Sequence, residues 1–228
     1  MKKLITLLVL MVTTVSLHAF EVTIGQLKYD INVPTQSATV VIPKEGYFDN
    51  YINGHLTIPS EIIYNGEKFA VTGIGENAFY GNYGMTSVDI PNSVISIGPN
   101  AFGETSLSTV FIPSSVTSLS CWTFARCPNL TSIMVDENNP AYSSIDGVLY
   151  SDSNTHLLTY PQGLDGEFQI PEGVKYIDDV AFYECSKLTS VKLPKTVLTI
   201  RREAFNGCTG LNSIEFYWCP VNVFTRLF

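Results

Sequence analysis

A phrase of 22 or 23 residues is repeated along this chain, and it limits the possible folds more than any other feature. Each copy begins with an apolar residue and Pro, continues through Val-x-x-Ile to an Ala-Phe pair, and ends with Leu-x-x-Val, with occasional substitutions. A fixed period means that one structural unit is stacked on the next, so the sequence predicts a solenoid. The five copies begin at Ile58-Pro59, Ile90-Pro91, Ile112-Pro113, Ile170-Pro171 and Leu193-Pro194.

The residue types within a copy predict the path of one coil. Between Leu188 and Leu193 apolar residues alternate with polar ones, which is typical of a short strand. Pro194 has no amide hydrogen and ends that strand. Ile200 and Ala204 are four residues apart, which predicts one or two helical or 3-10 turns. The unit length lies in the leucine-rich-repeat range of roughly 20–29 residues, so we expect a mostly β leucine-rich-repeat solenoid.

The Phe of each copy is expected to fill the centre of its coil. Burial of one such side chain stabilises the fold by about 2–3 kcal/mol. A small residue follows three positions later, where its side chain can reach backbone groups inside the turn. This column consists of Asn82, Thr105, Cys127, Cys185 and Cys208.

The chain divides into four predicted segments. Lys2 and Lys3 precede an apolar run from Leu4 to Val15, which is typical of a secretory signal cleaved after Ala19. The run is shorter than the roughly 20 residues of a membrane span. The segments are a signal peptide at 1–19, an N-terminal β cap at 20–56, a solenoid at 57–217 with hairpin insertions near 62–71 and 136–168, and a short C-terminal remnant at 218–228.

The charge of the chain argues against nucleic acid as a partner. The net charge is −8, and it becomes −10 without Lys2 and Lys3. Nucleic-acid phosphates require a basic surface, which such a chain does not supply.

Two phrases resemble the BspA-like, or Treponema-type, leucine-rich-repeat family. One is the repeated Ile-Pro-x-x-Val-x-x-Ile-x-x-x-Ala-Phe, and the other runs from Asn139-Pro140 through Ile145-Asp146-Gly147 to Tyr150. The resemblance covers residues 56–217. It implies a bacterial surface or secreted protein of a kind implicated in adhesion, and it carries no catalytic motif.

The residues that could carry metal or nucleophile chemistry have simpler interpretations. A zinc site usually contains closely spaced cysteines such as Cys-x-x-Cys, and the sequence has no such pair. Cys127, Cys185 and Cys208 are expected to be buried free thiols, although a disulfide between the last two is an alternative. His55 and His156 are interpreted as surface or loop residues, because no nucleophile motif accompanies them.

Calcium is an alternative to a solvated turn at residues 136–139, with Asp152 and Asn154 as further oxygen ligands. The spacing does not match an EF-hand loop. The sequence therefore predicts no metal and no cofactor.

A strip of outward-facing strand residues is the candidate partner-binding surface, expected on the concave side of the solenoid. Phe111 and Met134 would form a small apolar patch within it. A plain sheet face without a ligand is the alternative. The candidate strip consists of Asp89, Thr109, Phe111, Ser132, Met134, Ser190, Lys192 and Glu215. A candidate basic patch consists of Lys187, Lys195, Arg201 and Arg202.

These features predict an exported, non-catalytic binding protein. Its expected partner is a protein, either a host-matrix or a bacterial surface component, and no membrane span is expected after signal removal. The alternative is a structural spacer or assembly component with no specific ligand.

Overall fold

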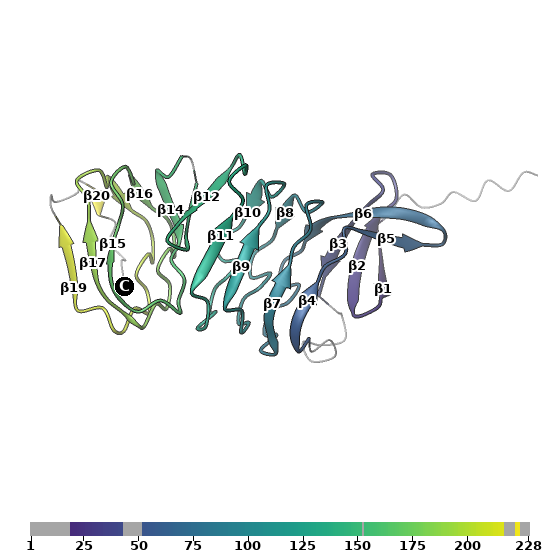
Figure 1. The fold of residues 1–228 in the computed structure, drawn as a ribbon, viewed down its shortest axis with the longest axis horizontal. Coiled ribbons are helices and arrows are strands. Elements are labelled where there is room, and N and C mark those ends of the chain that lie inside the picture. Colours follow the sequence, from purple (N-terminus) through teal and green to yellow (C-terminus); the bar gives the residue numbers. More distant parts are fainter. Residues whose placement is uncertain (1–18, 43–51, 152, 217–221, 224–228) are drawn as a thin grey trace, which may run out of the picture.

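The computed structural model describes residues 19–42, 52–151, 153–216 and 222–223. The described part of the chain is a β-solenoid whose coils follow one another along the longest axis of the molecule (Figure 1). Each regular coil contains a longer strand, a two-residue strand and a turn segment. The stacked solenoid that the period predicts is therefore confirmed.

The longer strands form what we call the long-strand face. They pair in parallel in three hydrogen-bonded groups. These strands are β4 (Gly54–Thr57) with β7 (Met85–Asp89), β9 (Thr109–Ile112) with β11 (Ser132–Val135), and β15 (Gly166–Gln169) with β17 (Leu188–Leu193) and β19 (Ser213–Phe216).

The second strand of each coil, which is the shorter one in the regular coils, lies on what we call the short-strand face. These strands pair in parallel from coil to coil in two groups that are not hydrogen-bonded to each other. This face contains β6 (Glu67–Ile74), β8 (Ser96–Ile97), β10 (Ser118–Leu119), β14 (His156–Thr159), β16 (Tyr176–Ile177), β18 (Thr199–Ile200) and β20 (Asn222–Val223).

The cap continues the short-strand face. Its strands β1 (Phe20–Ile24), β2 (Leu27–Asn32) and β3 (Ser37–Val41) form an antiparallel meander, and β3 then pairs in parallel with β6. This pairing covers the N-terminal end of the first coil, so the backbone groups along that edge of β6 are hydrogen-bonded rather than exposed. Because β4 already pairs with β7, the stack begins at Gly54, slightly before the predicted boundary at residue 57.

Both predicted hairpins are present. The strand β5 (Glu61–Tyr64) pairs with β6 around Asn65-Gly66, and β12 (Tyr142–Ile145) pairs with β13 (Val148–Ser151) around Asp146-Gly147. All four turn residues have positive φ, between 51° and 83°. Asn-Gly and Asp-Gly are the residue pairs that favour such two-residue turns.

The turn segments contain no helix within the described residues, so the predicted helical turns are wrong. We call this third side the turn face, made of segments 75–82, 98–105, 120–127, 178–185 and 201–208. Two residues in most of these segments have positive φ, one on each side of the Phe, such as Asn77 with Gly81 and Glu203 with Gly207. A left-handed residue interrupts a right-handed helix, and the Phe79 amide bonds to the Ala101 carbonyl of the next coil (2.8 Å) instead.

The Phe side chains form the predicted buried column. Phe79, Phe102 and Phe124 stack with centroid separations of 5.4 and 5.8 Å, and Phe182 stacks on Phe205 at 4.7 Å. All five are buried. Offset stacking of aromatic rings adds to the hydrophobic stabilisation of each coil.

The interruption between β11 and β15 divides the core. Leu149 of β13 packs with the N-terminal hydrophobic core, whereas its neighbours Val148 and Tyr150 pack with the C-terminal one. The β12–β13 hairpin contacts β11, and the Ile133 amide donates to the Gly147 carbonyl (2.8 Å). The hairpin therefore occupies the place where the next long strand would pair.

Tyr160 takes the position of Phe in the irregular coil. We call the aromatic residue that fills the centre of a coil its plug. The Tyr160 amide donates to the Ala181 carbonyl (2.8 Å), as the amides of Phe79, Phe102 and Phe182 do to the next coil, and its ring lies 5.1 Å from that of Phe182. The irregular coil is therefore also filled by a buried aromatic side chain. Tyr160 lies 22 residues before Phe182, so the repeat period itself could have found it.

Candidate functional site

The long-strand face places the predicted strip in register. Thr109 lies opposite Ser132 and Phe111 opposite Met134, while Lys192 lies opposite Glu215. Phe111 and Met134 are each 45% exposed, so the small apolar patch is present at the surface.

The strip differs from the prediction in two respects. Ser190 is buried (7% exposed), because its short side chain lies between the longer chains of Glu167 and Lys192, whose charged ends meet at 3.3 Å. It therefore adds no accessible surface. The strip is also divided, because the β12–β13 hairpin separates Met134 from the strands that carry Lys192 and Glu215.

A polar network adjoins the apolar patch on the same face. His55 bonds through Nδ1 to the Ser87 hydroxyl (2.9 Å) and through Nε2 to the Asp89 carboxylate (3.0 Å), and Thr57 also donates to Asp89 (3.3 Å). The His55 and Asp89 side chains are 51% and 66% exposed. Ser87 lies on a flat strand rather than on a sharp nucleophile turn, so the network resembles surface hydrogen bonding more than a catalytic triad.

The predicted basic patch is not brought together. Lys187 precedes β17 and Lys195 follows it, so the two lie at opposite ends of a strand of six residues, about 20 Å apart. Arg201 and Arg202 follow β18 at the start of a turn segment, where Arg201 pairs with Asp178 (3.1 Å). The repeat distributes these residues around the coil, so nearness in sequence does not produce one surface.

The cysteine column is buried as expected. The thiols of Cys127 and Cys208 donate to the carbonyls of Phe102 (3.1 Å) and Phe182 (2.9 Å), and Cys185 approaches the Tyr160 carbonyl (3.6 Å). Burial raises the pKa of the Cys127 thiol. These cysteines are free in the structure, and Cys121 is half-buried, whereas Cys219 lies outside the described residues.

The remaining metal and histidine candidates have structural contacts. Asp136 accepts bonds from the backbone and side chain of Asn138 (2.9 and 3.2 Å), and no group of metal ligands is found among the described residues. Asp152 lies outside them. His156 is half-buried against Asp178 (3.0 Å) and stacks on Tyr176 (4.4 Å), so its interpretation as a surface or loop residue is wrong.

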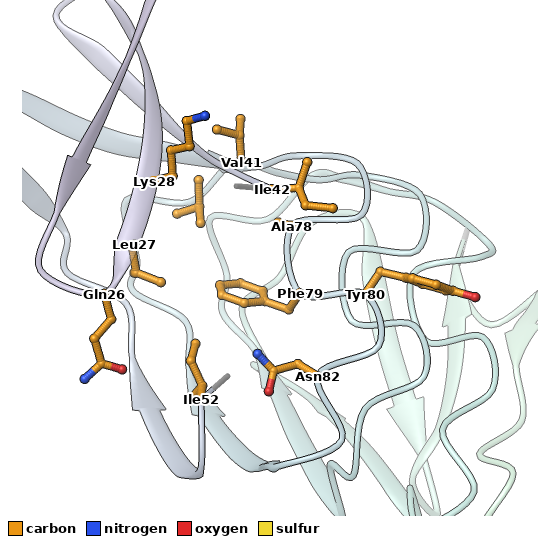
Figure 2. A pocket seen from close by; sticks show the side chains of 11 residues that line it. Gln26, Leu27, Lys28, Val41, Ile42, Ile52, Ala78, Phe79, Tyr80 and Asn82 are labelled. Atoms are coloured by element: carbon orange, nitrogen blue, oxygen red, sulfur yellow. The ribbon is translucent and has the colours of Figure 1, made fainter. Parts of the chain in front are cut away.

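A small cavity lies between the cap and the first coil. Figure 2 shows Phe79 pointing toward Leu27 and Ile52 at this junction. The cavity volume is about 20 Å³, which is enough for a single water molecule but far below the 300–1,000 Å³ typical of ligand pockets.

A larger groove of about 580 Å³ lies on the turn face. Three coils on the N-terminal side of the interruption and one on the C-terminal side contribute to it. Sequence reasoning did not find this turn-face groove. Its lining includes Tyr80, Asn100, Trp122, Ala125, Arg126 and Tyr183.

The fold and its repeated columns define a leucine-rich-repeat solenoid. Within this class, a family model described as the BspA type leucine rich repeat region matches residues 47–166 and 165–225, with six copies. The chain therefore belongs to the BspA-type leucine-rich-repeat family.

Several solved structures have the same fold. A T. pallidum leucine-rich-repeat protein is 22% identical, with a TM-score of 0.55 and coverage of 90% of this chain and 86% of that one. A leucine-rich cell surface protein from Faecalibacterium prausnitzii is 22% identical, with a TM-score of 0.53 and coverage of 86% and 76%. The pneumococcal vaccine antigen PcpA is 20% identical, with a TM-score of 0.52 and coverage of 87% and 70%. No curated protein matches the chain.

The structure contains no helix long and apolar enough to cross a membrane, as far as the described residues extend.

Proposed function

We propose that this protein is an exported, non-catalytic binding module that contacts another protein through the N-terminal part of its long-strand face. The observation that carries the proposal is the pairing of Phe111 with Met134, each 45% exposed, on adjacent rigid strands. Exposed apolar side chains surrounded by polar ones are typical of protein-interaction surfaces.

The neighbouring residues support a docking role. His55, Ser87 and Asp89 supply donors and acceptors beside the apolar pair, and Thr109 lies on the same face. A few apolar anchors within a polar rim is the usual composition of a non-obligate interface. Structural neighbours described as a cell surface protein and as a vaccine antigen favour a role outside the cell.

The experiment compares capture of proteins by the mature chain and by a Phe111→Ser, Met134→Ser variant. Immobilised protein is exposed to matrix proteins and to bacterial surface extracts, and bound proteins are identified by mass spectrometry. The matched control is Ile95→Ser, Leu198→Ser, which removes two exposed apolar residues elsewhere (50% and 51% exposed). We expect loss of at least tenfold in affinity for the strip variant alone, with its melting temperature unchanged.

A spacer would behave differently. It would show no saturable partner, or it would retain the same partner in both variants. Export is tested separately by expression of the full chain in a bacterial host, where the secreted form should begin at Phe20.

A further inference from the structure

The turn-face groove arises from residue size at one position of the repeat. The residue directly after the plug is Tyr80, Gly103, Ala125 and Tyr183 in the coils concerned. A side chain at Gly103 would meet the Tyr80 ring at 3.0 Å, so this ring lies over the glycine. The groove is lined at this repeat position by Tyr80, which covers Gly103, by the small side chain of Ala125, and by Tyr183.

The interruption supplies the far wall of the groove. The turn of the irregular coil is reduced to Tyr160–Gly163, and a side chain at Gly163 would approach the Leu130 carbonyl at 2.6 Å. This close approach brings Tyr183 to Trp122, with their ring centroids 5.1 Å apart in an edge-to-face arrangement. The groove therefore depends on a feature that occurs once in the described solenoid.

The lining presents aromatic rings beside unused hydrogen-bonding groups. Neither the Trp122 indole nor the Asn100 amide bonds to another side chain or backbone group in the described part of the chain, and both belong to the lining. The amide of Asn77 lies one coil away from that of Asn100, at the same repeat position. An indole donates one bond, and each amide both donates and accepts.

The one cation at the groove is neutralised. Arg126 pairs with Glu104 (3.1 Å) and Glu184 (3.2 Å), and its guanidinium lies 5.9 Å from the Tyr183 ring centre. Hydrogen bonds from Tyr80 and then Tyr83 hold the pKa of the Glu104 carboxyl below its usual value, so this carboxylate remains ionised. An anionic ligand would therefore meet no excess positive charge.

We propose that the turn-face groove binds a neutral glycan segment. A sugar ring presents apolar C–H groups on its face, which pack on aromatic rings such as Trp122, and hydroxyls at its edge, which bond to amides such as Asn100. The volume of about 580 Å³ suits a segment of a few sugar units. An extended peptide is less suited, because the turn face offers no free strand edge for backbone pairing.

The experiment uses the fluorescence of Trp122. The chain contains two tryptophans, so the Trp218→Phe variant leaves Trp122 as the only indole. This variant is titrated with neutral soluble polysaccharides of different linkage (dextran, mannan, soluble starch and hydroxyethyl cellulose), with heparin as an acidic comparison and gelatin as a peptide comparison. We expect saturable quenching and a blue shift with at least one neutral polysaccharide, and none with heparin.

Variants connect the signal to the groove. Asn100→Gly removes the amide and keeps the positive φ of 51° that this position requires. Trp122→Leu removes the stacking surface, and its binding is measured by retardation in affinity electrophoresis. We expect each variant to lose at least tenfold in affinity with an unchanged melting temperature, and Phe111→Ser, on the long-strand face, to bind the polysaccharide normally.

Three outcomes would overturn the proposal. They are no response to any neutral polysaccharide, equal retardation of Trp122→Leu and the unaltered protein, and a response to gelatin alone. The last result would assign the groove to peptides. Each outcome is independent of protein capture by the long-strand face, which the Phe111→Ser, Met134→Ser variant tests.

Discussion

Individual residues on the turn face adopt conformations that their side chains do not favour. Val180, Glu184 and Glu203 have φ values of 56°, 54° and 55°. A left-handed conformation costs roughly 1–2 kcal/mol for most L-residues and less for Asn or Gly. Asn77 and Asn100 occupy the position equivalent to that of Glu203 in other coils. The repeat therefore accommodates Asn, which adopts positive φ at a lower cost than Glu, at this position.

Replacement of Glu203 with Asn should stabilise the protein. The expected gain is about 0.3–1 kcal/mol in the free energy of unfolding, because Asn tolerates positive φ better than Glu does. The measurement is urea denaturation at pH 7.

The matched control is Glu172→Asn, an exposed position outside the positive-φ set, where we expect a change within about 0.5 kcal/mol. Equal effects at both positions would show that backbone strain is not the cause.

For these turn segments, the sequence predicted which Phe side chains are buried in a column, but it did not predict the backbone conformation of the residues beside them. Apolar spacing reports which side chains are buried, whereas it does not report the sign of φ. Gly81 and Gly207 were signals of left-handed turns, but Glu104 and Arg126 stand at the same position in other coils and hide the pattern. The helical spacing of Ile200 and Ala204 was therefore misleading.

Among the larger elements, the β12–β13 hairpin is attached to the preceding part of the chain by the side chains of Asn139, Tyr142 and Ser144, of which Asn139 makes the most hydrogen bonds. The Asn139 amide donates to the carbonyls of Pro113 (2.8 Å) and Val116 (3.0 Å), and its oxygen accepts from the amides of Ala141 (2.9 Å) and Tyr142 (2.8 Å). Four hydrogen bonds at one half-buried residue hold the irregular coil in register.

Substitution of Asn139 with Ala should cost about 2–4 kcal/mol, because it leaves several backbone groups without partners. Chemical denaturation measures the loss. The neighbouring Asn138→Ala is the control, since its side chain is exposed and bonds only to Asp136 (3.2 Å); we expect a loss below about 1 kcal/mol. A similar small loss for Asn139→Ala would contradict the role assigned to it.

Strands and hairpins were predictable because their signals are local. The turns at Asn65-Gly66 and Asp146-Gly147 are encoded by adjacent residues. The turn-face groove was not predictable, because Tyr183 meets Trp122 only through the shortened turn of a coil between them. The burial of Ser190 likewise depends on Glu167, a residue of another strand.

For the whole molecule, buried tyrosines couple stability to alkaline pH. Burial raises the pKa of Tyr29 to about 12, and it also raises the pKa values of Tyr150 and Tyr160. The folded protein retains these protons at a pH where the unfolded chain, with an ordinary pKa of about 10, has lost them. Their contribution is therefore fully present below pH 10 and is lost as the pH rises toward 12 and beyond.

The Tyr29→Phe variant should lose less stability than the unaltered protein between pH 8 and pH 11. Because the pKa of Tyr29 is about 12 in the folded protein and about 10 in the unfolded chain, its ionisation lowers the free energy of unfolding by about 1.4 kcal/mol at pH 11. Urea denaturation at the two pH values gives the comparison, and at pH 8 the two proteins should agree within about 1 kcal/mol. Identical losses at pH 11 would show that Tyr29 does not contribute.

The two hydrophobic cores of the molecule meet at β13. Leu149 belongs to one hydrophobic core while Tyr150, the next residue, belongs to the other. In a stack of repeats, cooperativity extends only as far as the contacts between neighbours are strong. Under heat or mechanical load the C-terminal half can therefore open while the long-strand surface around Phe111 stays intact, whereas the turn-face groove is lost because Tyr183 belongs to the half that opens.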